Sequence, residues 1–347
     1  MLAEHIEIAG AIDVEQGPDY RRPWRLPVAD LELHHPRLVT AAIGSSGIRL
    51  RFRTAATRLV LDVEPVGVSQ PEQFRGGCPP YQLVLDGHPQ PVLLAPPHRE
   101  QVHFDGLPPG AKDVELWLPE LSGVRLFDLR AADGAEIRSP RPTHRPRWTV
   151  YGSSITHGLL GAPALTWPAV AARQLGRELT NLGYAGECHL DPLVGQMIAE
   201  HPAEHITLKL GINVHNWQSQ RERAFLPAVH GLVATIRNRQ PHTPITVVSP
   251  VYSPSRETSG VTHVDRPGIS PFTTEGDLSL EQMRDILADI VAVRRRRGDA
   301  ALHYLDGREL LGKDDVAQLM DGLHPNLEGL QLIGQRYAAC SAAWYAW

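Results

Sequence analysis

Hydrophobic and polar positions alternate over short stretches through the first 145 residues. Stretches such as GIRLRFRT and YQLVLDG place apolar side chains at about every second position, which is the period of a half-buried β-strand. The recognisable stretches are 47–54, 57–65, 81–87, 113–119 and 123–134. Turn-forming DG, PP and PPG sequences separate them. This pattern predicts an antiparallel β-sandwich, jelly-roll-like in arrangement, for the N-terminal part of the chain.

From Trp148 onward the periodicity changes. Short apolar runs typical of buried strands now alternate with longer segments of helical periodicity. The expected strands are 148–152, 178–183, 205–211, 244–251 and 301–307, and the expected helices are 167–176, 223–239, 278–298 and 326–344. Strands and helices in alternation predict a parallel sheet with helices on both faces, and hence a three-layer α/β domain.

Two stretches lack any periodicity. SPRPTHRPR at 139–147 is rich in proline and arginine, which is typical of a linker. We therefore expect a β-sandwich domain over 1–140, a linker over 141–147 and an α/β domain over 148–347. The second stretch, 252–277, is rich in Ser, Pro, Gly and Thr, and a loop of this length is often a lid or a binding loop.

Composition and charge narrow the classes of function. The 347-residue chain is 42% hydrophobic and carries a formal net charge of −5, so nothing indicates a nucleic-acid or anionic-membrane partner. Its 3 cysteines are widely spaced, which favours neither a disulfide framework nor a zinc site. The N-terminus lacks the basic and apolar regions of a signal peptide, and no apolar run reaches the length of about 18 residues that a membrane span needs. A cytoplasmic enzyme is the expectation, and the sequence does not indicate an oligomeric state.

Polar residues directly follow several of the predicted strands, and more lie just before the last helix. In an open parallel sheet, ligands bind beyond the carboxyl ends of the strands. The segments placed there are GSSIT at 152–156, NLGYAG at 181–186, GIN at 211–213 and DGLHP at 321–325. They bring a hydroxyl, a glycine amide, a carboxamide and an Asp–His pair to one edge. These are the groups that acyl transfer requires.

The chemistry assigns a role to each group. Ser154 is a weak nucleophile that needs a base, and His324 supplies one in its neutral form. Asp321, three residues before His324, can hold the imidazole tautomer and stabilise the imidazolium. The backbone amides of Ser154 and Gly186 and the side-chain amide of Asn213 can stabilise a tetrahedral oxyanion, at roughly 3 kcal/mol each.

These four segments, in this order, resemble the four sequence blocks of the SGNH hydrolase superfamily, also called GDSL-type esterases. The resemblance covers residues 148–347 and implies a flavodoxin-like three-layer fold. It implies Ser154 as the nucleophile, Ser154, Gly186 and Asn213 in the oxyanion hole, and Asp321 and His324 as the rest of a catalytic triad.

Two positions depart from the family pattern. Ser153 stands where the family usually has an aspartate before the nucleophile, and Val214 replaces the acid that usually follows Asn213. Neither position belongs to the triad, so we expect activity to persist with altered local positioning. The N-terminal β-sandwich is similar to that of bacterial two-domain carbohydrate esterases. It is also similar to that of actinobacterial enzymes that tailor natural products, some of which are acyltransferases.

At several positions a structural role is an alternative to a catalytic role. Ser154 taken alone would be a helix N-cap, and only the other three segments favour a nucleophile. The sequence GSSG at 44–47 predicts a tight turn instead of a second nucleophile. His157 is expected to line a pocket or pack. Asp306 is expected in a turn, as a reserve candidate for the triad acid.

Further candidates surround the predicted site. Tyr184, His215 and Trp217 are possible lining residues of an acyl or leaving-group pocket, with packing as the alternative. His201 and His205 have the spacing of a metal pair, but the stretch HPAEH lacks the HExxH order. We therefore expect no metal site and no cofactor.

The sequence predicts a serine esterase that works through an acyl-enzyme. The expected substrate is a short acyl ester, acetyl-like, of a carbohydrate or a small glycosylated molecule. The alternative is an acyltransferase that moves an acyl group onto a small-molecule alcohol, which uses the same acyl-enzyme. A second alternative is a catalytically inert carbohydrate-binding protein, against which the intact Ser154, Asp321 and His324 argue.

Overall fold

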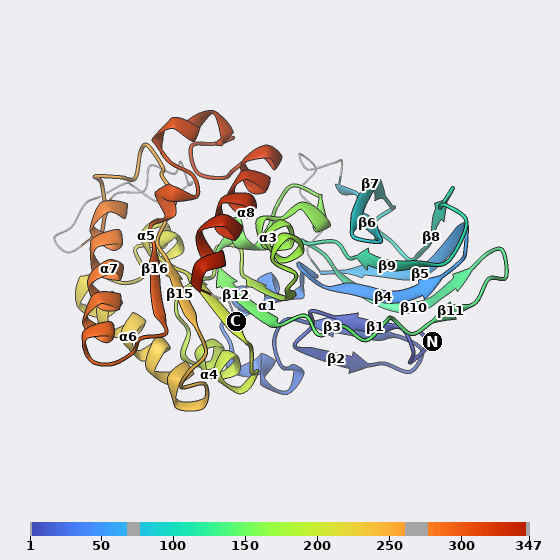
Figure 1. Ribbon diagram of the computed structural model, residues 1–347, viewed down its shortest axis with the longest axis horizontal. Coiled ribbons are helices and arrows are strands. Elements are labelled where there is room, and N and C mark those ends of the chain that lie inside the picture. The colour runs from blue at the N-terminus through green and yellow to red at the C-terminus, as the bar shows by residue number, and fades with distance from the viewer. Residues whose placement is uncertain (1, 68–76, 261–276, 345–347) are drawn as a thin grey trace. The chain divides into compact units, whose positions relative to one another are not determined.

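The computed structural model describes residues 2–67, 77–260 and 277–344 (Figure 1). The chain divides into two compact units. The first comprises Met1–Arg145 and His157–Leu182, and the second comprises Pro146–Thr156 and Gly183–Trp347.

Two antiparallel sheets form the body of the first unit. One has the strand order β1-β4-β9-β6-β7 with β11 beside β4, and the other has the order β2-β3-β10-β5-β8. The strands are β1 (Glu7–Ala9), β2 (Asp13–Gln16), β3 (Arg21–Trp24), β4 (Arg49–Thr54), β5 (Arg58–Val66), β6 (Pro80–Leu85), β7 (His88–Leu94), β8 (Glu100–Asp105), β9 (Lys112–Trp117), β10 (Gly123–Ala131) and β11 (Ile137–Arg138). The predicted antiparallel sandwich is confirmed.

Side chains from both sheets fill one hydrophobic core. Leu50 of β4 lies opposite Leu116 of β9, and Leu61 of β5 lies opposite Leu129 of β10. All four leucines are at most 5% exposed and belong to the same cluster of buried residues. Because burying a leucine contributes roughly 1.5–3 kcal/mol, the alternating pattern that predicts the strands also supplies the stabilisation of the sandwich.

The sequence pattern does not predict every element of this unit. Strand β7 contains Pro89 and Pro91, which disfavour a strand, yet it forms at the edge of its sheet, where an N–H group is dispensable. The short strands β1, β2 and β3, the strand β8, the helix α1 (Pro36–Ile43) and the 3₁₀ helix η1 (Val28–Leu33) are also absent from the prediction.

The GSSG segment forms the predicted tight turn. The carbonyl of Ser45 accepts a hydrogen bond of 2.9 Å from the backbone N–H three residues later, and Gly47 adopts φ +79°, which favours glycine. The hydroxyl of Ser46 accepts a hydrogen bond from Asn181 Nδ2 at 2.9 Å and donates one to the carbonyl of His157. Contacts between residues distant in sequence therefore join the segment His157–Leu182 to the first unit.

A parallel sheet forms the centre of the α/β part. Its strand order is β13-β12-β14-β15-β16. The strands are β12 (Arg147–Gly152), β13 (Glu178–Gly183), β14 (His205–Lys209), β15 (Ile245–Val248) and β16 (Leu302–Leu305). β12 pairs with β14, β14 with β15, and β15 with β16, all in parallel. Each strand lies where the sequence predicts it, and the predicted α/β fold class is confirmed.

Helices connect the strands, as expected for parallel pairing. They are α2 (Ser154–His157), α3 (Trp167–Leu175), α4 (Pro192–Glu200), α5 (Ile212–Trp217), α6 (Glu222–Arg239), α7 (Leu280–Arg296) and α8 (Leu327–Ser341), with the 3₁₀ helices η3 (Pro163–Leu165), η4 (Gly307–Glu309), η5 (Lys313–Gln318) and η6 (Ala342–Trp344). The sequence pattern predicts neither α4 nor the short helix α5. Among the described helices, none combines the length and the apolarity needed to span a bilayer.

The two faces of the sheet have different neighbours. On one face the ring of Tyr337 from α8 stacks on Trp148, with ring centroids 5.2 Å apart, and its hydroxyl lies 2.6 Å from Thr207 Oγ1. Tyr151 points to the opposite face, because side chains alternate along β12, and its hydroxyl accepts a hydrogen bond of 3.1 Å from Leu190 N, just before α4. Helices therefore cover both faces.

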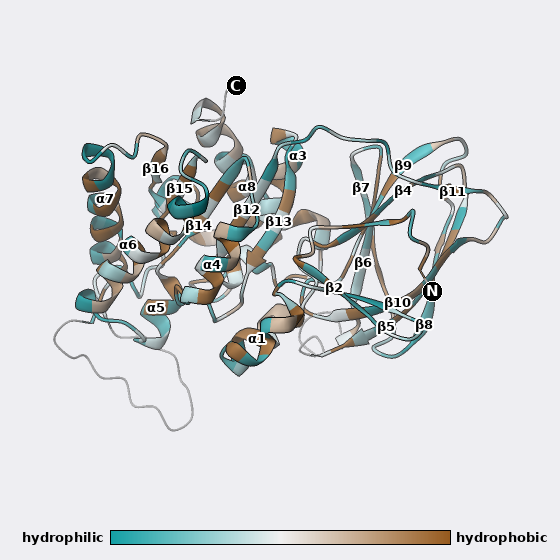
Figure 2. Cartoon of the chain, turned by 90° about the horizontal axis from the view of Figure 1, so that it is seen from below, coloured by the Kyte–Doolittle hydropathy of each residue, from teal (hydrophilic) through white to brown (hydrophobic). Residues whose placement is uncertain are grey.

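The helix α7 illustrates how local sequence sets an element's limits. Ser279 and Gln282 form a capping box at its start, and Gly298 with φ +103° follows its end. Figure 2 shows hydrophobic and hydrophilic residues alternating along this helix, and Leu287 and Ile290 are among its buried residues. The capping box and the apolar stripe explain why the predicted range, 278–298, differs by only two residues at each end.

A buried lysine opposes the stability of this sheet. Lys209, the last residue of β14, is 1% exposed, and its Nζ atom has no hydrogen-bond partner among the described residues. Burial lowers the pKa of Lys209 to about 8, whereas an unfolded lysine titrates near 10.4. At neutral pH the folded protein therefore holds a poorly solvated ammonium group.

We predict that Lys209→Met raises the free energy of unfolding by roughly 2–3 kcal/mol at pH 7, because methionine has a similar volume and no charge to desolvate. Between the two pKa values the unfolded state binds more protons, so the stability of the wild type rises with pH and the advantage of the variant shrinks toward pH 10. Urea unfolding at both pH values measures this, with Lys313→Met on the exposed helix η5 as control. A gain that is absent, or equal at both pH values, contradicts the prediction.

Candidate active site

Ser154 lies at a tight junction between β12 and the short helix α2. The strand ends at Gly152, and Ser154 is the first residue of the helix and only 8% exposed. A Cβ atom at Gly152 would lie 2.4 Å from Thr156 Oγ1, so only glycine fits this turn. The turn places the Ser154 hydroxyl at the carboxyl end of a central strand.

The Ser154 hydroxyl, the His324 ring and the Asp321 carboxylate form a continuous chain of hydrogen bonds. Ser154 Oγ lies 3.0 Å from His324 Nε2, and His324 Nδ1 lies 2.7 Å from Asp321 Oδ2. Because an ionised carboxylate only accepts hydrogen bonds, Nδ1 carries the proton in the neutral ring. Nε2 is then the free acceptor, and the serine hydroxyl donates to it.

The turn that carries Asp321 and His324 is held by its own backbone. Asp321 Oδ1 accepts hydrogen bonds from the N–H groups of Leu323 at 3.0 Å and His324 at 2.6 Å. Partial burial raises the pKa of Asp321, but the hydrogen bonds from the side chain and backbone of His324 outweigh it, and the pKa lies below its usual value. The Asp321 side chain is 55% exposed, so the cost of its desolvation is limited, and these hydrogen bonds keep the carboxylate ionised at neutral pH.

Two further segments bring possible oxyanion donors to the same edge. Gly186 has φ +79°, and its segment is tied to the nucleophile turn by a hydrogen bond of 2.8 Å from Tyr184 N to the carbonyl of Gly152. Asn213 lies in the first turn of α5, and its Oδ1 accepts a hydrogen bond of 3.0 Å from Cys188 N. This bond fixes the orientation of the amide and leaves Nδ2 as the end that can donate to a ligand.

The predicted pocket residues have different environments. Tyr184 is fully buried and contacts the ring of Tyr151 edge-on, with centroids 6.2 Å apart. His215 is buried, and its Nδ1 lies 2.9 Å from the carbonyl of Leu278. Burial lowers the pKa of His215, and the ring is therefore neutral at pH 7. Trp217, the last residue of α5, is partly exposed. A role for these three in substrate binding stays a prediction.

The reserve acid Asp306 and the neighbouring residues His157 and Ser153 do not join the hydrogen-bond chain of Ser154, His324 and Asp321. Asp306 caps η4 and pairs with Arg308 at 2.7 Å. The ring of His157 is buried, with Nε2 2.6 Å from the carbonyl of Glu120, and burial holds its pKa well below the usual value. Ser153 is fully buried, and its hydroxyl makes no hydrogen bond to a described residue.

The two histidines with metal-pair spacing also serve packing. His201 Nδ1 lies 2.9 Å from the carbonyl of Met197, and His205 Nε2 lies 3.1 Å from the hydroxyl of Tyr337. Within residues 2–67, 77–260 and 277–344, no group of three or more potential ligand side chains could hold a metal ion.

Sequence reasoning missed residues that support the Asp321 turn. Ser253 Oγ donates a hydrogen bond of 2.7 Å to the carbonyl of Gly322, and Arg256 Nη1 donates one of 3.1 Å to Ser253 Oγ. The signal was the position of Ser253 shortly after β15, because the predicted site residues Ser154, Gly186 and Asn213 also follow strands of the sheet, namely β12, β13 and β14. Most of the predicted loop, residues 261–276, lies outside the described residues.

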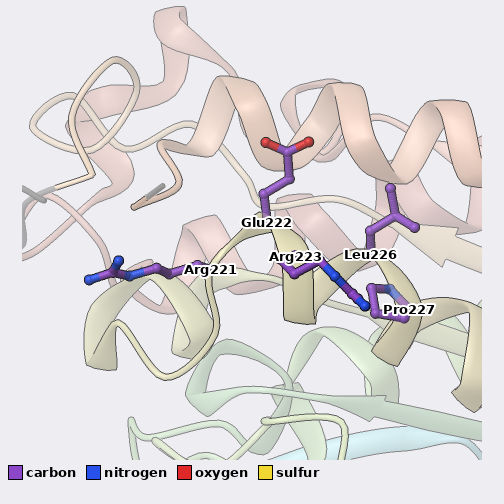
Figure 3. Close-up of a pocket in the computed structure, with 5 residues that line it drawn as sticks. All are labelled: Arg221, Glu222, Arg223, Leu226 and Pro227. Carbon is purple, nitrogen blue, oxygen red and sulfur yellow. The ribbon is translucent and has the colours of Figure 1, made fainter. Parts of the chain in front are cut away.

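Figure 3 shows a cavity of about 470 Å³ at the start of α6, lined by Arg221, Glu222, Arg223, Leu226 and Pro227. Arg221 and Glu222 point in different directions, and Arg223 extends toward Pro227. Its charged side chains do not converge on one point, and no residue of the predicted catalytic set lines it. The Ser154 region remains the better candidate site.

A parallel α/β sheet with a Ser–His–Asp chain at its carboxyl edge defines the class of serine-dependent acyl-transfer enzymes. The sequence matches the GDSL-like lipase/acylhydrolase family over residues 146–340. This match covers more than half of the chain, so the protein belongs to this family, and the predicted SGNH resemblance is confirmed. Residues 6–127 match the N-terminal domain of SsfX3.

Solved structures resemble the whole chain. The salicylyl-acyltransferase SsfX3 from a tetracycline biosynthetic pathway is 28% identical, with a TM-score of 0.86 over 98% of this chain and 95% of that one. A putative GDSL-like lipase from Bacteroides ovatus is 21% identical, with a TM-score of 0.78 over 99% and 97%. A family two carbohydrate esterase from Clostridium thermocellum, in complex with cellohexaose, is 15% identical, with a TM-score of 0.68 over 97% and 99%. The last two show the fold alone. No curated protein matches this chain.

We predict that Asp321→Asn lowers kcat for p-nitrophenyl acetate about 10³- to 10⁴-fold with little change in KM, because an amide does not hold the Nδ1–H tautomer of His324. Release of p-nitrophenol measures this. Asp314→Asn, an exposed acidic residue of η5, is the control. Retention of more than about a tenth of the wild-type kcat by Asp321→Asn contradicts the assignment.

Proposed function

We propose that the protein is an acyltransferase that moves an acyl group, through an ester on Ser154, onto an alcohol of a small molecule. The observation that carries the proposal is the 28% identity to a salicylyl-acyltransferase over 98% of this chain. That likeness includes the N-terminal region, which matches the corresponding domain of SsfX3 over residues 6–127. It therefore concerns the whole two-part protein and not only the family's shared catalytic region.

The hydrogen-bond chain supports the first chemical step. His324 Nε2 accepts the proton of the Ser154 hydroxyl while Oγ attacks the acyl carbonyl carbon of the donor. The tetrahedral oxyanion receives hydrogen bonds from the amides of Ser154 and Gly186 and from Asn213 Nδ2. When it collapses, the bond to the leaving group breaks, and His324 gives its proton to that group. The acyl group remains on Ser154.

The second step reverses these roles with a new partner. An acceptor alcohol gives its proton to His324 Nε2, and its oxygen attacks the acyl carbon on Ser154. Collapse returns the proton to Ser154 Oγ and releases the new ester. Asp321 stabilises the imidazolium in both steps through the hydrogen bond to Nδ1.

Hydrolysis is the second candidate, because water can replace the alcohol in the second step. The family's description as acylhydrolases favours it. Cleavage of acetyl groups from carbohydrate has weaker support, since the similar carbohydrate esterases show only a shared fold at 15% identity. An inert carbohydrate-binding protein is disfavoured, because the Ser154–His324 distance of 3.0 Å is that of an assembled nucleophile and base.

We predict that Ser154→Ala abolishes acyl-enzyme formation, with at least a 10³-fold loss of p-nitrophenyl acetate turnover, because no other hydroxyl contacts His324 among the described residues. Ser153→Ala is the matched control and keeps the activity. Intact-protein mass spectrometry detects the acetyl adduct on the wild type. If Ser153→Ala loses the adduct and Ser154→Ala keeps it, the nucleophile is wrongly assigned.

We predict that the acyl-enzyme favours an alcohol over water. Mass spectrometry of the products, with p-nitrophenyl acetate and p-nitrophenyl salicylate as donors and a panel of phenols and polyols as acceptors, measures the ratio of ester to free acid. A recognised acceptor should exceed the ratio given by methanol at equal concentration by about 10-fold or more, since a bound alcohol is positioned for attack. Release of free acid alone with every acceptor contradicts the acyltransferase and supports the hydrolase.

A further inference from the structure

We propose that Arg256 is a positioning residue for the acyl transfer described above. It joins the helix that carries Asn213 to the turn that carries Asp321 and His324. The inference rests on the proposed function, and it concerns a residue that does not itself touch the reacting atoms.

The contacts of Arg256 span two parts of the site. Its Nε donates a hydrogen bond of 3.1 Å to Asn216 Oδ1, and Asn216 lies on the short helix α5 with Asn213. Its Nη1 donates one of 3.1 Å to Ser253 Oγ, which in turn donates one of 2.7 Å to the carbonyl of Gly322. Gly322 lies between Asp321 and His324 in the chain. One guanidinium group therefore connects an oxyanion-hole helix with the turn of the acid and the base.

The loop that bears Arg256 is anchored by α7. Arg284 binds both carboxylate oxygens of Glu257, at 2.7 and 2.9 Å, and donates to the carbonyls of Pro250 at 3.1 Å and Val251 at 3.2 Å. Glu257 Oε1 also accepts a hydrogen bond of 2.9 Å from Ser253 N. Arg284 is 2% exposed and Glu257 7% exposed, so this anchor is shielded from water. These hydrogen bonds therefore hold the loop that carries Arg256 in place.

Asn216 provides the polar contact of α5 to Arg256. The residue after Asn213 is Val214, which offers no polar group to neighbouring loops. Asn216, one position after His215, is the residue of α5 that accepts the hydrogen bond from Arg256. Arginine suits this place because its planar fork directs Nε and Nη1 to two partners at once, which a lysine ammonium does not match.

The charge of Arg256 faces titratable groups from several elements. Burial lowers the pKa of Arg256, and attraction to Asp321 acts in the opposite direction. On α5 it faces His215, whose environment also includes Asp277 and Glu257. Its side chain is buried, at 7% exposure, so its field on Asp321 is only partly screened. The positive charge of Arg256 therefore favours the ionised form of Asp321.

The test compares Arg256→Met, Arg256→Lys and Ser253→Ala with the wild type, using p-nitrophenyl acetate over a range of pH. Arg256→Met should lower kcat about 10- to 100-fold with KM changed less than about 3-fold, because misplaced reacting groups slow the acyl transfer more than they weaken binding. It should also move the acid limb of kcat/KM upward by roughly half to one pH unit, since loss of a buried positive charge that interacts with Asp321 favours protonation of the coupled Asp321–His324 pair. Ser253→Ala and Arg256→Lys keep the charge, so they should lower kcat and leave the acid limb in place.

Arg237→Met is the matched control for loss of a largely buried arginine. Arg237 pairs with Asp299 at 2.9 Å and caps backbone carbonyls at the end of α6, outside the catalytic set. It should change stability but neither kcat nor the acid limb. Wild-type values of both kcat and the acid limb in Arg256→Met overturn the inference alone. An inactive wild type overturns the proposed function together with the inference.

Discussion

The hydrogen bond from His324 Nδ1 to Asp321 Oδ2 is the interaction on which the site depends. At 2.7 Å it decides which ring nitrogen holds the proton, and so it makes Nε2 the acceptor for the Ser154 hydroxyl. The same carboxylate accepts two backbone N–H groups of its own turn, which fixes its direction and lowers its pKa. An acid with its side chain 55% exposed is thus held in place by local hydrogen bonds and not by burial.

The parallel sheet determines where these groups meet. β12 and β14 are neighbours, and the segments that follow them carry Ser154 and Asn213 respectively. The segments that follow parallel strands all begin at the carboxyl edge of the sheet. Residues far apart in sequence therefore lie close together there. The sheet also tolerates an unfavourable feature there, because Lys209 ends β14 as a buried ammonium without a described hydrogen-bond partner. Such features are more common beside functional sites than in packed cores.

A second network of hydrogen bonds surrounds the first one. Arg284 and Glu257 form a buried ion pair, and removal of one partner would leave an uncompensated charge in the interior. The pair holds the loop from which Ser253 and Arg256 reach the Asp321 turn. In the proposed function, rigid placement of the base favours both steps of acyl transfer, because misplaced reacting groups slow the attack and the proton transfer.

The sequence by itself determined the β-sandwich and the positions of the parallel strands along the polypeptide. It also identified Ser154, Asp321 and His324, the three residues that the hydrogen bonds connect. Period-two and helical patterns are local, and four short segments after strands are enough to locate the carboxyl edge of a sheet. Only the tertiary structure decided the contacts that join distant segments. Examples are the Cys188 N–H that orients Asn213, the packing of His157 against Glu120, and the link from Arg256 through Ser253 to Gly322. Each of these contacts depends on how two segments distant in sequence meet in space. The hydrophobic periodicity within a single segment does not contain that information.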